Sequence, residues 1–524
     1  MHGPRCCAGS IGSTPATSPD ISYQISNRGV SMTVETAQQR LARIFALQKT
    51  AYLNAPNPSA DVRIDRMRRI PVMLRKHREA ILAALDADFG GHSRELGDLI
   101  EILGMVDRAE FNIHNIAKWM KPIPKTVNPV ILGKSKAYVQ YQPKGVVGNM
   151  VSWNFPFDIG LGPTLDALGA GNRVIIKPSD LSPACGRVLQ DMVAETFDEN
   201  EVAVVNGDIE LAKHFPTLSW DHLIYTGSGT VGREVMKAAA ANLVPVTLEL
   251  GGKCPTVIDA EAALDALTIE TVAGIKAIKR GQMCVSVDYC LVPETSLLAF
   301  TQALAAYMNA HFGKNHGAQH SCGIVSDRHM ARLNQLVQDA RDSGAEVIQI
   351  GDDLLPGDRH MPFYLIVNPS DDCAVMREEI FGPLLPIKTY QDTQDAIRQI
   401  NAGDRPLGLY VFSKNRQFID EVTQNTHSGG VAINTIAAQA AMPSMGFGGS
   451  GGSGMGRHHG EEGFREFSNP RGYFVREAGG VVDWVRPPYG EGTQKLIHEV
   501  AYASTAKKLQ FAIPQLIKNL FAKD

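Results

Sequence analysis

Long apolar runs, abundant cysteines and charge of one sign are all missing from this chain. No stretch of the sequence approaches the roughly 18 consecutive apolar residues of a membrane-spanning helix. Its 8 cysteines are too few and too scattered for a disulfide framework, and no Cys/His spacing matches a zinc site. We therefore expect no metal, and free thiols in a reducing, cytoplasmic compartment.

Basic residues are also too sparse to form a field that attracts nucleic acid. The formal net charge is −4, and Lys and Arg are scattered along the chain. The densest basic group, Lys276, Lys279 and Arg280, is interpreted as a solvated helix end. Nucleic acid is not the expected partner.

Length and composition predict a globular protein of more than one domain. The chain has 524 residues, with 44% hydrophobic and 20% charged side chains, so two domains of unequal size are expected. Residues 1–31 are rich in Gly, Ser, Thr and Pro and lack the apolar core of a signal peptide. We expect a disordered leader there, or a start upstream of the true one at Met32.

Helical periodicity begins after Met32 and gives way to an extended segment at 122–141. The helical apolar positions are Leu41, Ile44, Phe45, Met67, Ile70, Leu74, Ile81 and Leu85. The extended segment carries Pro, Gly and the β-formers Val127, Val130, Ile131, Tyr138, Val139 and Tyr141. This pattern predicts a bridging hairpin outside the main domain, and such a hairpin is typical of an oligomer contact, here a homodimer.

The next hundred residues alternate between buried strands and helices. Strands are predicted at 146–151, 174–176, 202–205, 223–225 and 246–250, with helices near 161–168, 186–196, 209–215 and 231–241. Alternation of this kind predicts an α/β fold with a parallel, doubly wound sheet. Ligands bind such sheets at the carboxyl ends of the strands.

The fourth predicted strand runs into a glycine-rich turn. Gly227-Ser228-Gly229-Thr230-Val231-Gly232 matches the G-x-G-x-x-G dinucleotide pattern between a strand and a helix. In the standard fingerprint an acidic residue about twenty positions later binds the ribose, and Glu249 lies near that distance. The pattern alone therefore leaves a ribose-binding and a catalytic Glu249 open, as well as a turn without any ligand.

Two further glycine-bracketed turns carry a thiol and a carboxylate. Cys284 lies in Gly281-Gln282-Met283-Cys284, and Glu249 opens Glu249-Leu250-Gly251-Gly252-Lys253. Alone, a Cys is more often a small buried hydrophobe, and a Glu a solvated surface group. Together they are the parts needed to form a covalent thioester and hydrolyse it.

Six motifs in order give the chain a family resemblance from about Met32 to Pro488. They are Trp153-Asn154-Phe155-Pro156, Lys177-Pro178-Ser179-Asp180, the turn at 227–232, the segment 249–253, the segment 281–284, and Glu378-Glu379-Ile380-Phe381-Gly382-Pro383. The chain resembles the aldehyde dehydrogenases. Met283-Cys284 leading to Asp288-Tyr289, with Arg486-Pro487-Pro488-Tyr489, is most similar to the class 3, fatty-aldehyde and coniferyl aldehyde dehydrogenase branch.

The resemblance implies a role for each motif. Cys284 attacks the aldehyde, the Asn154 amide and the Cys284 N–H hold the oxyanion, and Glu249 activates the water that releases the acid. The implied coenzyme contacts are Trp153, Lys177, Asp180, Gly227, Ser228, Gly232, Glu379 and Phe381. Glu249 is then catalytic, and the ribose acid lies elsewhere.

The resemblance also implies a division of the chain. Residues 32–121 and 142–250 form a Rossmann-like coenzyme domain, 122–141 the bridging hairpin and 251–442 an α/β catalytic domain. Residues 443–524 supply a substrate-side loop, a return segment and an amphipathic tail. The tail has an apolar stripe at Leu509, Ile513, Leu516 and Leu520 with lysines beside it, and packing on protein is favoured over a membrane surface.

Departures from the family pattern bear on the coenzyme and on the Asn154 turn. Asp180 stands where many NAD-preferring members carry Glu, so NAD is expected with NADP left open. Ser152 replaces a frequent Pro, a change interpreted as affecting turn stiffness more than chemistry. Ser450 matches G-x-S-x-G but lacks the flanking strand and helix of a hydrolase elbow, and is interpreted as loop.

The substrate expected from the branch is an aromatic or cinnamyl-type aldehyde such as coniferyl aldehyde. Medium-chain aliphatic aldehydes remain open. An acylating dehydrogenase that passes the thioester to coenzyme A is disfavoured by Glu249, because only hydrolysis needs a base. A non-catalytic relative is disfavoured because both Cys284 and Glu249 are present.

Overall fold

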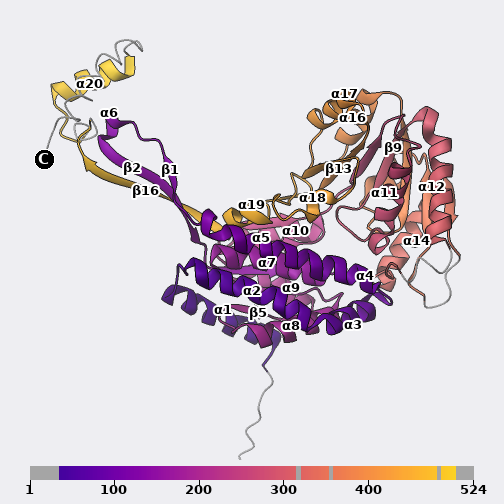
Figure 1. The fold of residues 1–524 in the computed structure, drawn as a ribbon, viewed down its shortest axis with the longest axis horizontal. Helices are drawn as coiled ribbons and strands as arrows, with labels where there is room; N and C mark the ends of the chain where they lie inside the picture. Colours follow the sequence, from indigo (N-terminus) through magenta and orange to yellow (C-terminus); the bar gives the residue numbers. More distant parts are fainter. Residues whose placement is uncertain (1–34, 314–319, 353–357, 481–485, 503–524) are drawn as a thin grey trace, which may run out of the picture. The chain divides into compact units, whose positions relative to one another are not determined.

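The computed structural model describes residues 35–313, 320–352, 358–480 and 486–502, and the chain from Ala37 onward forms one unit (Figure 1). The predicted leader at 1–31 and the apolar stripe of the tail lie outside the described residues. Helix α20 (Glu491–Tyr502) is the last described element. In the described part of the chain, no helix combines the length and the apolar character needed to cross a membrane.

The first large sheet contains all five predicted strands. They are β3 (Val146–Met150), β4 (Arg173–Lys177), β5 (Val202–Val204), β6 (His222–Thr226) and β7 (Val246–Glu249). The strand order is β15-β7-β6-β3-β4-β5, and the five predicted strands are mutually parallel. The sixth strand, β15 (Gly454–Met455), pairs antiparallel with the end of β7. The predicted doubly wound, Rossmann-like sheet is confirmed.

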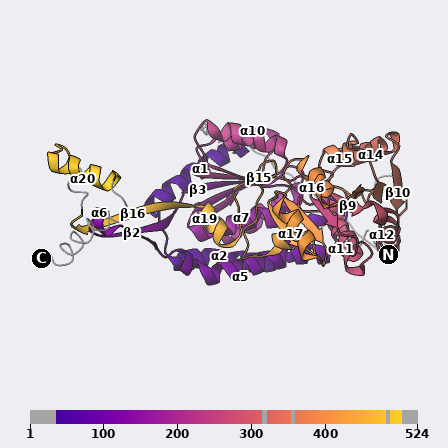
Figure 2. The same cartoon turned by 90° about the horizontal axis from the view of Figure 1, so that it is seen from above.

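Helices cover both faces of this sheet. Helices α1 (Ala37–Asn54), α9 (Ile209–His214) and α10 (Gly229–Ala240) pack against one face. Helices α2 (Ala60–Lys76), α3 (Arg78–Phe89), α5 (Gly104–Trp119), α7 (Pro156–Ala170) and α8 (Pro183–Thr196) form a core with the other face. Figure 2 shows α10 and α5 on opposite sides of the strands. The apolar positions predicted for α1 to α3 are those that face these cores.

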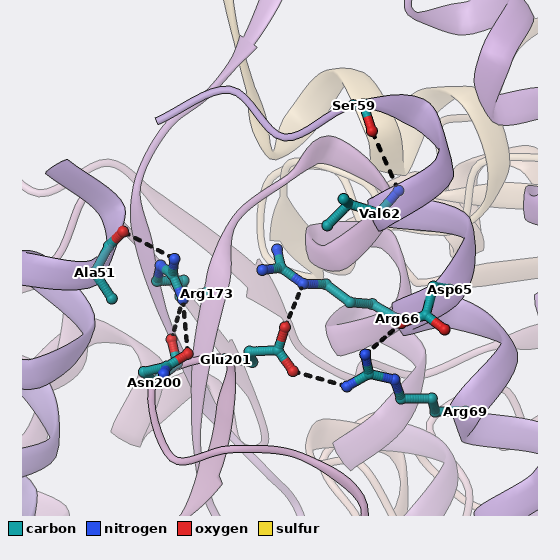
Figure 3. Close-up of polar contacts among 9 residues, drawn as sticks. All are labelled: Ala51, Ser59, Val62, Asp65, Arg66, Arg69, Arg173, Asn200 and Glu201. Atoms are coloured by element: carbon teal, nitrogen blue, oxygen red, sulfur yellow. Dashed lines mark hydrogen bonds and ion pairs between the residues drawn. The ribbon is translucent and has the colours of Figure 1, made fainter. Parts of the chain in front are cut away.

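Arginine contacts tie the first two helices to the β4–β5 edge of the sheet (Figure 3). Glu201 accepts hydrogen bonds from Arg66 Nε and Arg69 Nη1, both at 2.8 Å. Arg173 of β4 donates to Ala51 O at 2.8 Å and to the Asn200 side chain at 3.1 Å. The Arg66 and Glu201 side chains are only 8% and 13% exposed, so this is a largely buried pair.

The second large sheet carries most of the chain between 255 and 433. Its strands are β8 (Pro255–Ile258), β9 (Tyr289–Pro293), β10 (Glu346–Ile350), β11 (Phe363–Val367), β12 (Leu384–Tyr390), β13 (Gly408–Phe412) and β14 (Gly430–Ile433). Their order is β10-β11-β12-β9-β8-β13-β14, and β10 alone is antiparallel to its neighbour. Helices α11 (Ala266–Ala277), α12 (Leu297–Phe312), α14 (Asp327–Asp342), α16 (Thr393–Asn401) and α17 (Arg416–Gln424) surround it in Figure 1.

The predicted bridging hairpin forms, but with one correction. Strands β1 (Ile123–Lys125) and β2 (Lys134–Pro143) pair antiparallel. Val130 and Ile131, taken as β-formers of the hairpin, lie instead in the short helix α6 (Pro129–Leu132), because the connection turns sharply between Asn128 and Gly133. A third strand that the sequence did not predict, β16 (Ser468–Ala478), pairs with β2 and completes the sheet.

Candidate active site

Predicted coenzyme-binding and catalytic residues lie at or just after the carboxyl ends of neighbouring strands. Trp153 comes three residues after β3, Lys177 ends β4, Gly227 follows β6 and Glu249 ends β7. Because these strands are parallel and adjacent, their carboxyl ends lie along one edge of the sheet. The fold therefore gathers four segments that are far apart in the sequence.

The turn at 227–232 is held locally. Ser228 caps α10 by accepting a hydrogen bond from Val231 N at 3.4 Å. A Cβ at position 227 would lie 2.2 Å from Tyr225 Oη, and one at 232 would lie 2.9 Å from Leu250 Cδ2, so a larger residue at either position would force one of these side chains to move. The strand-to-helix context is confirmed, and the α10 N-terminus can accept a phosphate.

The β4 end offers a buried cation and an exposed carboxylate. Lys177 is 3% exposed, and burial lowers its pKa, while the nearby Asp180 and Asp208 oppose that shift. Asp180 lies three residues beyond the strand and is exposed. Lys177 and Asp180 are thus close enough to interact electrostatically, as the resemblance implies.

Glu379 lies against the Glu249-to-Lys253 segment. A Cβ on Gly251 would lie 2.1 Å from Glu379 Oε1, so a larger residue there would displace this carboxylate. Burial and the neighbouring Asp288 raise the pKa of Glu379 to about 8. Its Oε1 has no hydrogen-bond partner among the described residues, which leaves an acceptor for a ligand hydroxyl.

Aromatic contacts join the Asn154 turn to the Glu379 loop. The rings of Trp153 and Phe381 meet edge to face with centroids 5.3 Å apart, and Trp153 has a similar contact with His329. Phe381 adopts a φ of 51°, a left-handed conformation that a bulky residue holds only under restraint. Trp153, Glu379 and Phe381 therefore belong to one site.

Lys253 and Asp288 position this loop, although the sequence analysis gave neither a role. Lys253 Nζ donates to Val375 O at 2.7 Å and Glu378 O at 3.1 Å, and it also binds the Asp288 carboxylate. Asp288 Oδ1 accepts a hydrogen bond from Ile380 N at 3.0 Å. Both residues stand inside motifs that were recognised, so their place in the motifs was the available signal.

The basic group at 276–280 is buried, so its interpretation as a solvated helix end is wrong. Lys276, Lys279 and Arg280 are 1%, 0% and 4% exposed. Lys276 Nζ donates to Val287 O at 2.9 Å, and Arg280 donates to Cys322 O at 3.1 Å and Met361 O at 2.5 Å. Carbonyl oxygens replace the water that Lys276 and Arg280 lose, whereas Lys279 Nζ has no hydrogen-bond partner among the described residues and lies over aromatic faces.

Gln282 connects the cysteine loop to Asn154. Its side-chain amide donates to Lys279 O and Gly323 O, both at 3.0 Å, and accepts from Val325 N at 3.1 Å. Its backbone carbonyl accepts a hydrogen bond from Asn154 Nδ2 at 3.3 Å. Asn154 therefore contacts a residue only two positions before Cys284, so two of the three residues predicted to carry the chemistry lie in adjoining segments.

Ser152 orients the Asn154 amide. Its hydroxyl donates to Asn154 Oδ1 at 2.9 Å, which leaves the NH₂ group directed at the cysteine loop. The serine therefore acts on the donor itself in addition to any effect on turn stiffness. Asn154 is 2% exposed, so its amide works in a largely dehydrated environment where a hydrogen bond to an oxyanion is strong.

Glu249 is buried and without a hydrogen-bond partner among the described residues. It is 3% exposed, both of its carboxylate oxygens lack a partner, and burial raises its pKa well above the ordinary value. Burial likewise raises the pKa of the Cys284 thiol to about 12, with Glu379 and Glu249 contributing. The two groups are close enough to influence each other, and the raised pKa makes Glu249 a stronger base when ionised.

The whole arrangement fits a nicotinamide dinucleotide. A helix N-terminus behind a glycine turn, a buried lysine at the end of β4 and an unpartnered carboxylate oxygen on Glu379 supply contacts for phosphate and ribose groups. Among the described residues, no group of three or more His, Cys, Asp and Glu side chains could hold a metal ion. Ser450 lies in a loop between bends and hydrogen-bonds to Arg405, with no elbow around it.

Comparison with known proteins agrees with this geometry. The model of the aldehyde dehydrogenase family matches residues 25–472. The chain is 39% identical to a probable coniferyl aldehyde dehydrogenase of Caulobacter vibrioides, over 90% of this chain and 99% of the relative. It is 38% identical to a coniferyl aldehyde dehydrogenase of Pseudomonas sp. strain HR199, over 88% of this chain and 96% of the relative.

A solved structure supports the same conclusion. The substrate-bound state of Staphylococcus aureus AldH superposes with a TM-score of 0.81 at 32% identity, covering 88% of this chain and 99% of that one. The predicted family and branch are confirmed, and the enzyme is an NAD(P)-dependent aldehyde dehydrogenase. The chain belongs to the aldehyde dehydrogenase family.

Proposed function

We propose that this enzyme oxidises aromatic, cinnamyl-type aldehydes such as coniferyl aldehyde to the corresponding carboxylic acids. The observation that carries this proposal is 38–39% identity to proteins named for coniferyl aldehyde, over at least 88% of the chain. The burial of Asn154 and Glu249 beside the half-buried Cys284 supports a reaction largely shielded from bulk solvent. Medium-chain aliphatic aldehydes are the alternative that an assay must exclude.

In the proposed first half-reaction, the Cys284 thiolate attacks the aldehyde carbonyl carbon. The carbonyl oxygen becomes an oxyanion, which the Asn154 amide and the Cys284 N–H stabilise. The hydrogen bond from Ser152 keeps that amide facing the loop. Bound NAD(P) supplies the acceptor for the hydride that converts the thiohemiacetal into a thioester.

In the second half-reaction, Glu249 removes a proton from water while the water oxygen attacks the thioester carbonyl. The C–S bond then breaks, releasing the carboxylic acid and returning Cys284 as thiolate. The buried, unpartnered carboxylate of Glu249 suits this task, because its pKa is raised and no protein hydrogen bond competes with water.

The coenzyme is proposed to be NAD, with NADP as a second substrate. Lys177 and Asp180 would face the adenosine ribose and Glu379 the nicotinamide ribose, with Phe381 and Trp153 packed beside it. The pyrophosphate would bind to the turn that contains Gly227, Ser228 and Gly232. Asp180 is exposed and shorter than Glu, which supports room for a 2′-phosphate.

The predicted domain boundaries and the homodimer are retained as proposals. The three-stranded sheet of β1, β2 and β16 would form part of the dimer contact. Phe474 and Val475 of β16 support this, because they are 49% and 44% exposed and apolar.

The test is a panel of aldehydes assayed with NAD and with NADP. Coniferyl and other cinnamyl aldehydes should give the highest kcat/KM, and the acid should form without coenzyme A. Higher kcat/KM for medium-chain aliphatic aldehydes would refute the proposed substrate, and a requirement for coenzyme A would refute hydrolysis. The Cys284→Ala variant gives the background rate for each aldehyde.

A further inference from the structure

The two halves of the proposed oxyanion site come from distant parts of the chain. Asn154 follows β3 of the first sheet, whereas Cys284 precedes β9 of the second. The direct link between them is a single hydrogen bond of 3.3 Å, from Asn154 Nδ2 to Gln282 O. A site that needs both donors on one oxygen therefore requires further contacts to fix the spacing.

Lys279 is the side chain of the cysteine loop that reaches back toward the Asn154 turn. It is fully buried, and its Nζ lies 3.8 Å from Glu101 Oε1. The same ammonium lies over the Phe89 ring at 4.1 Å and the Phe155 ring at 4.9 Å from the centroids. Phe155 is the residue directly after Asn154, so the cation contacts the turn itself.

Glu101 holds the other side of that turn. It is fully buried in η1 (Gly97–Leu103), a π-helical segment of the kind often found at functional sites. Its Oε2 accepts hydrogen bonds from Phe157 N at 3.1 Å and Asp158 N at 2.8 Å, the first turn of α7. The α7 N-cap residue makes no side-chain cap, so Glu101 caps this helix from outside.

Backbone strain shows that the cysteine loop needs such restraint. Lys279 and Arg280 both have left-handed φ values, 50° and 51°, followed by Gly281 at 73°. For residues other than glycine such a conformation is unfavourable and persists only when neighbouring contacts enforce it. Buried contacts of Lys279 and Arg280 provide that enforcement.

These contacts form a closed ring that joins the Asn154 turn, the cysteine loop and Glu101. From Asn154 the path runs to Gln282 O, then from the Gln282 amide to Lys279 O at 3.0 Å. It continues from Lys279 Nζ to Glu101, and from Glu101 to the start of α7, four residues or fewer from Asn154. Asn154 is a member of this ring, and Cys284 lies two residues after Gln282, which is another member.

We propose that the Glu101–Lys279 ion pair is a positioning device that sets the spacing between the Asn154 amide and the Cys284 N–H. The inference rests on the proposed oxyanion role of those two donors. A buried ion pair adds little net stability, because the charges lose their hydration, so fixing one geometry is the better account of its presence. Lys279 and Glu101 act through Asn154 and Cys284, and do not touch the aldehyde.

The experiment compares the first turnover, followed as the burst of reduced coenzyme, in Lys279→Met and Glu101→Gln. Both should slow the burst about 10- to 100-fold, with KM for coenzyme unchanged, because a displaced donor weakens oxyanion binding. Adding Lys279→Met to Asn154→Ala should cost little more than Asn154→Ala alone, since both changes disable the same donor. Arg66→Met is the matched control, because it breaks the largely buried Arg66–Glu201 pair away from both donors and should leave the burst rate intact.

If Lys279→Met does not fold, the neutral pair Glu101→Gln with Lys279→Met replaces it, because no buried charge is then left alone. A full burst rate in either folded variant overturns the inference, as do effects that multiply with Asn154→Ala. The proposed function fails separately, if Cys284→Ala retains activity. An inactive Cys284→Ala with a normal Lys279→Met refutes the positioning role alone.

Discussion

The turn at 227–232 and the loop at 278–284 both belong to the candidate site, but they are held in opposite ways. The glycine turn is stabilised by near neighbours, since Ser228 caps its own helix and Gly227 packs on Tyr225. The cysteine loop is strained and depends on distant groups, among them Glu101, Cys322 and Met361. The proposed coenzyme turn is thus held by its own sequence, whereas the position of the proposed nucleophile Cys284 depends on distant segments.

Cys284→Ala should have the largest effect, because it changes the cysteine loop and leaves the glycine turn at 227–232 intact. Removing the thiol should abolish aldehyde oxidation while coenzyme still binds, because the nucleotide contacts come from other residues. Turnover and coenzyme binding followed by fluorescence would be measured together. Activity above a few per cent of the native rate would remove Cys284 from the mechanism, and Cys254→Ala, at the buried thiol whose Sγ lies 3.4 Å from Cys284 O, serves as the control.

Glu249→Gln should separate the first half-reaction, which ends in hydride transfer, from the second, which hydrolyses the thioester. The amide keeps the shape of the side chain but cannot accept a proton, so the burst of reduced coenzyme should survive and steady turnover should fall about 10²–10⁴-fold. Stopped-flow traces give both rates from one experiment. Unchanged steady turnover would assign the base to another group.

The pH dependence tests the burial of the two reacting groups. The pKa of Cys284 is raised to about 12 and that of Glu249 is raised well above its ordinary value, and in the proposed mechanism both act in their ionised forms. Turnover should therefore rise with pH from neutral into the alkaline range, by up to about tenfold per unit for each group that limits the rate. A rate that falls over that range would contradict this assignment; coenzyme binding measured in the same buffers is the control.

Asp180→Ser tests the proposed contact with the adenosine ribose, and of these substitutions it should change the kinetics least. A carboxylate beside the adenosine ribose repels a 2′-phosphate, so its removal should shift preference toward NADP. Because Asp180 is exposed, its removal should favour NADP by about 1 kcal/mol, which is several-fold in the ratio of kcat/KM for NADP to kcat/KM for NAD. An unchanged ratio would mean that Asp180 does not face the ribose, and would withdraw the assignment of Lys177 to Asp180.

The same comparison explains what could be predicted from the sequence. The five strands of the first sheet were predicted because each is a short run of β-formers that is buried on both faces. The glycine turn was predicted because its residues serve neighbours within a few positions. The grouping of Asn154, Glu249 and Cys284 came from the order of family motifs.

What escaped prediction depends on contacts between distant segments. Lys279 was taken for a surface residue because it stands in the densest basic group of the chain and lysines are nearly always solvated, and Glu101 carried no signal at all. Their pairing exists only after η1 and the cysteine loop have come together. The helix α6 was missed because β-formers in a short connection between two strands follow the geometry of the turn rather than their own propensity.

The antiparallel pairing of Gly454 with Glu249 has a consequence for synthesis of the chain. Five of the six strands of the first sheet are complete once residue 249 has been made, yet the edge that carries Glu249 is covered only when β15 emerges. At about 5–20 residues per second that interval lasts on the order of ten to forty seconds. During translation the nascent sheet therefore has an open edge, where another strand could pair, and the last part of that sheet to close is the one that holds the proposed base.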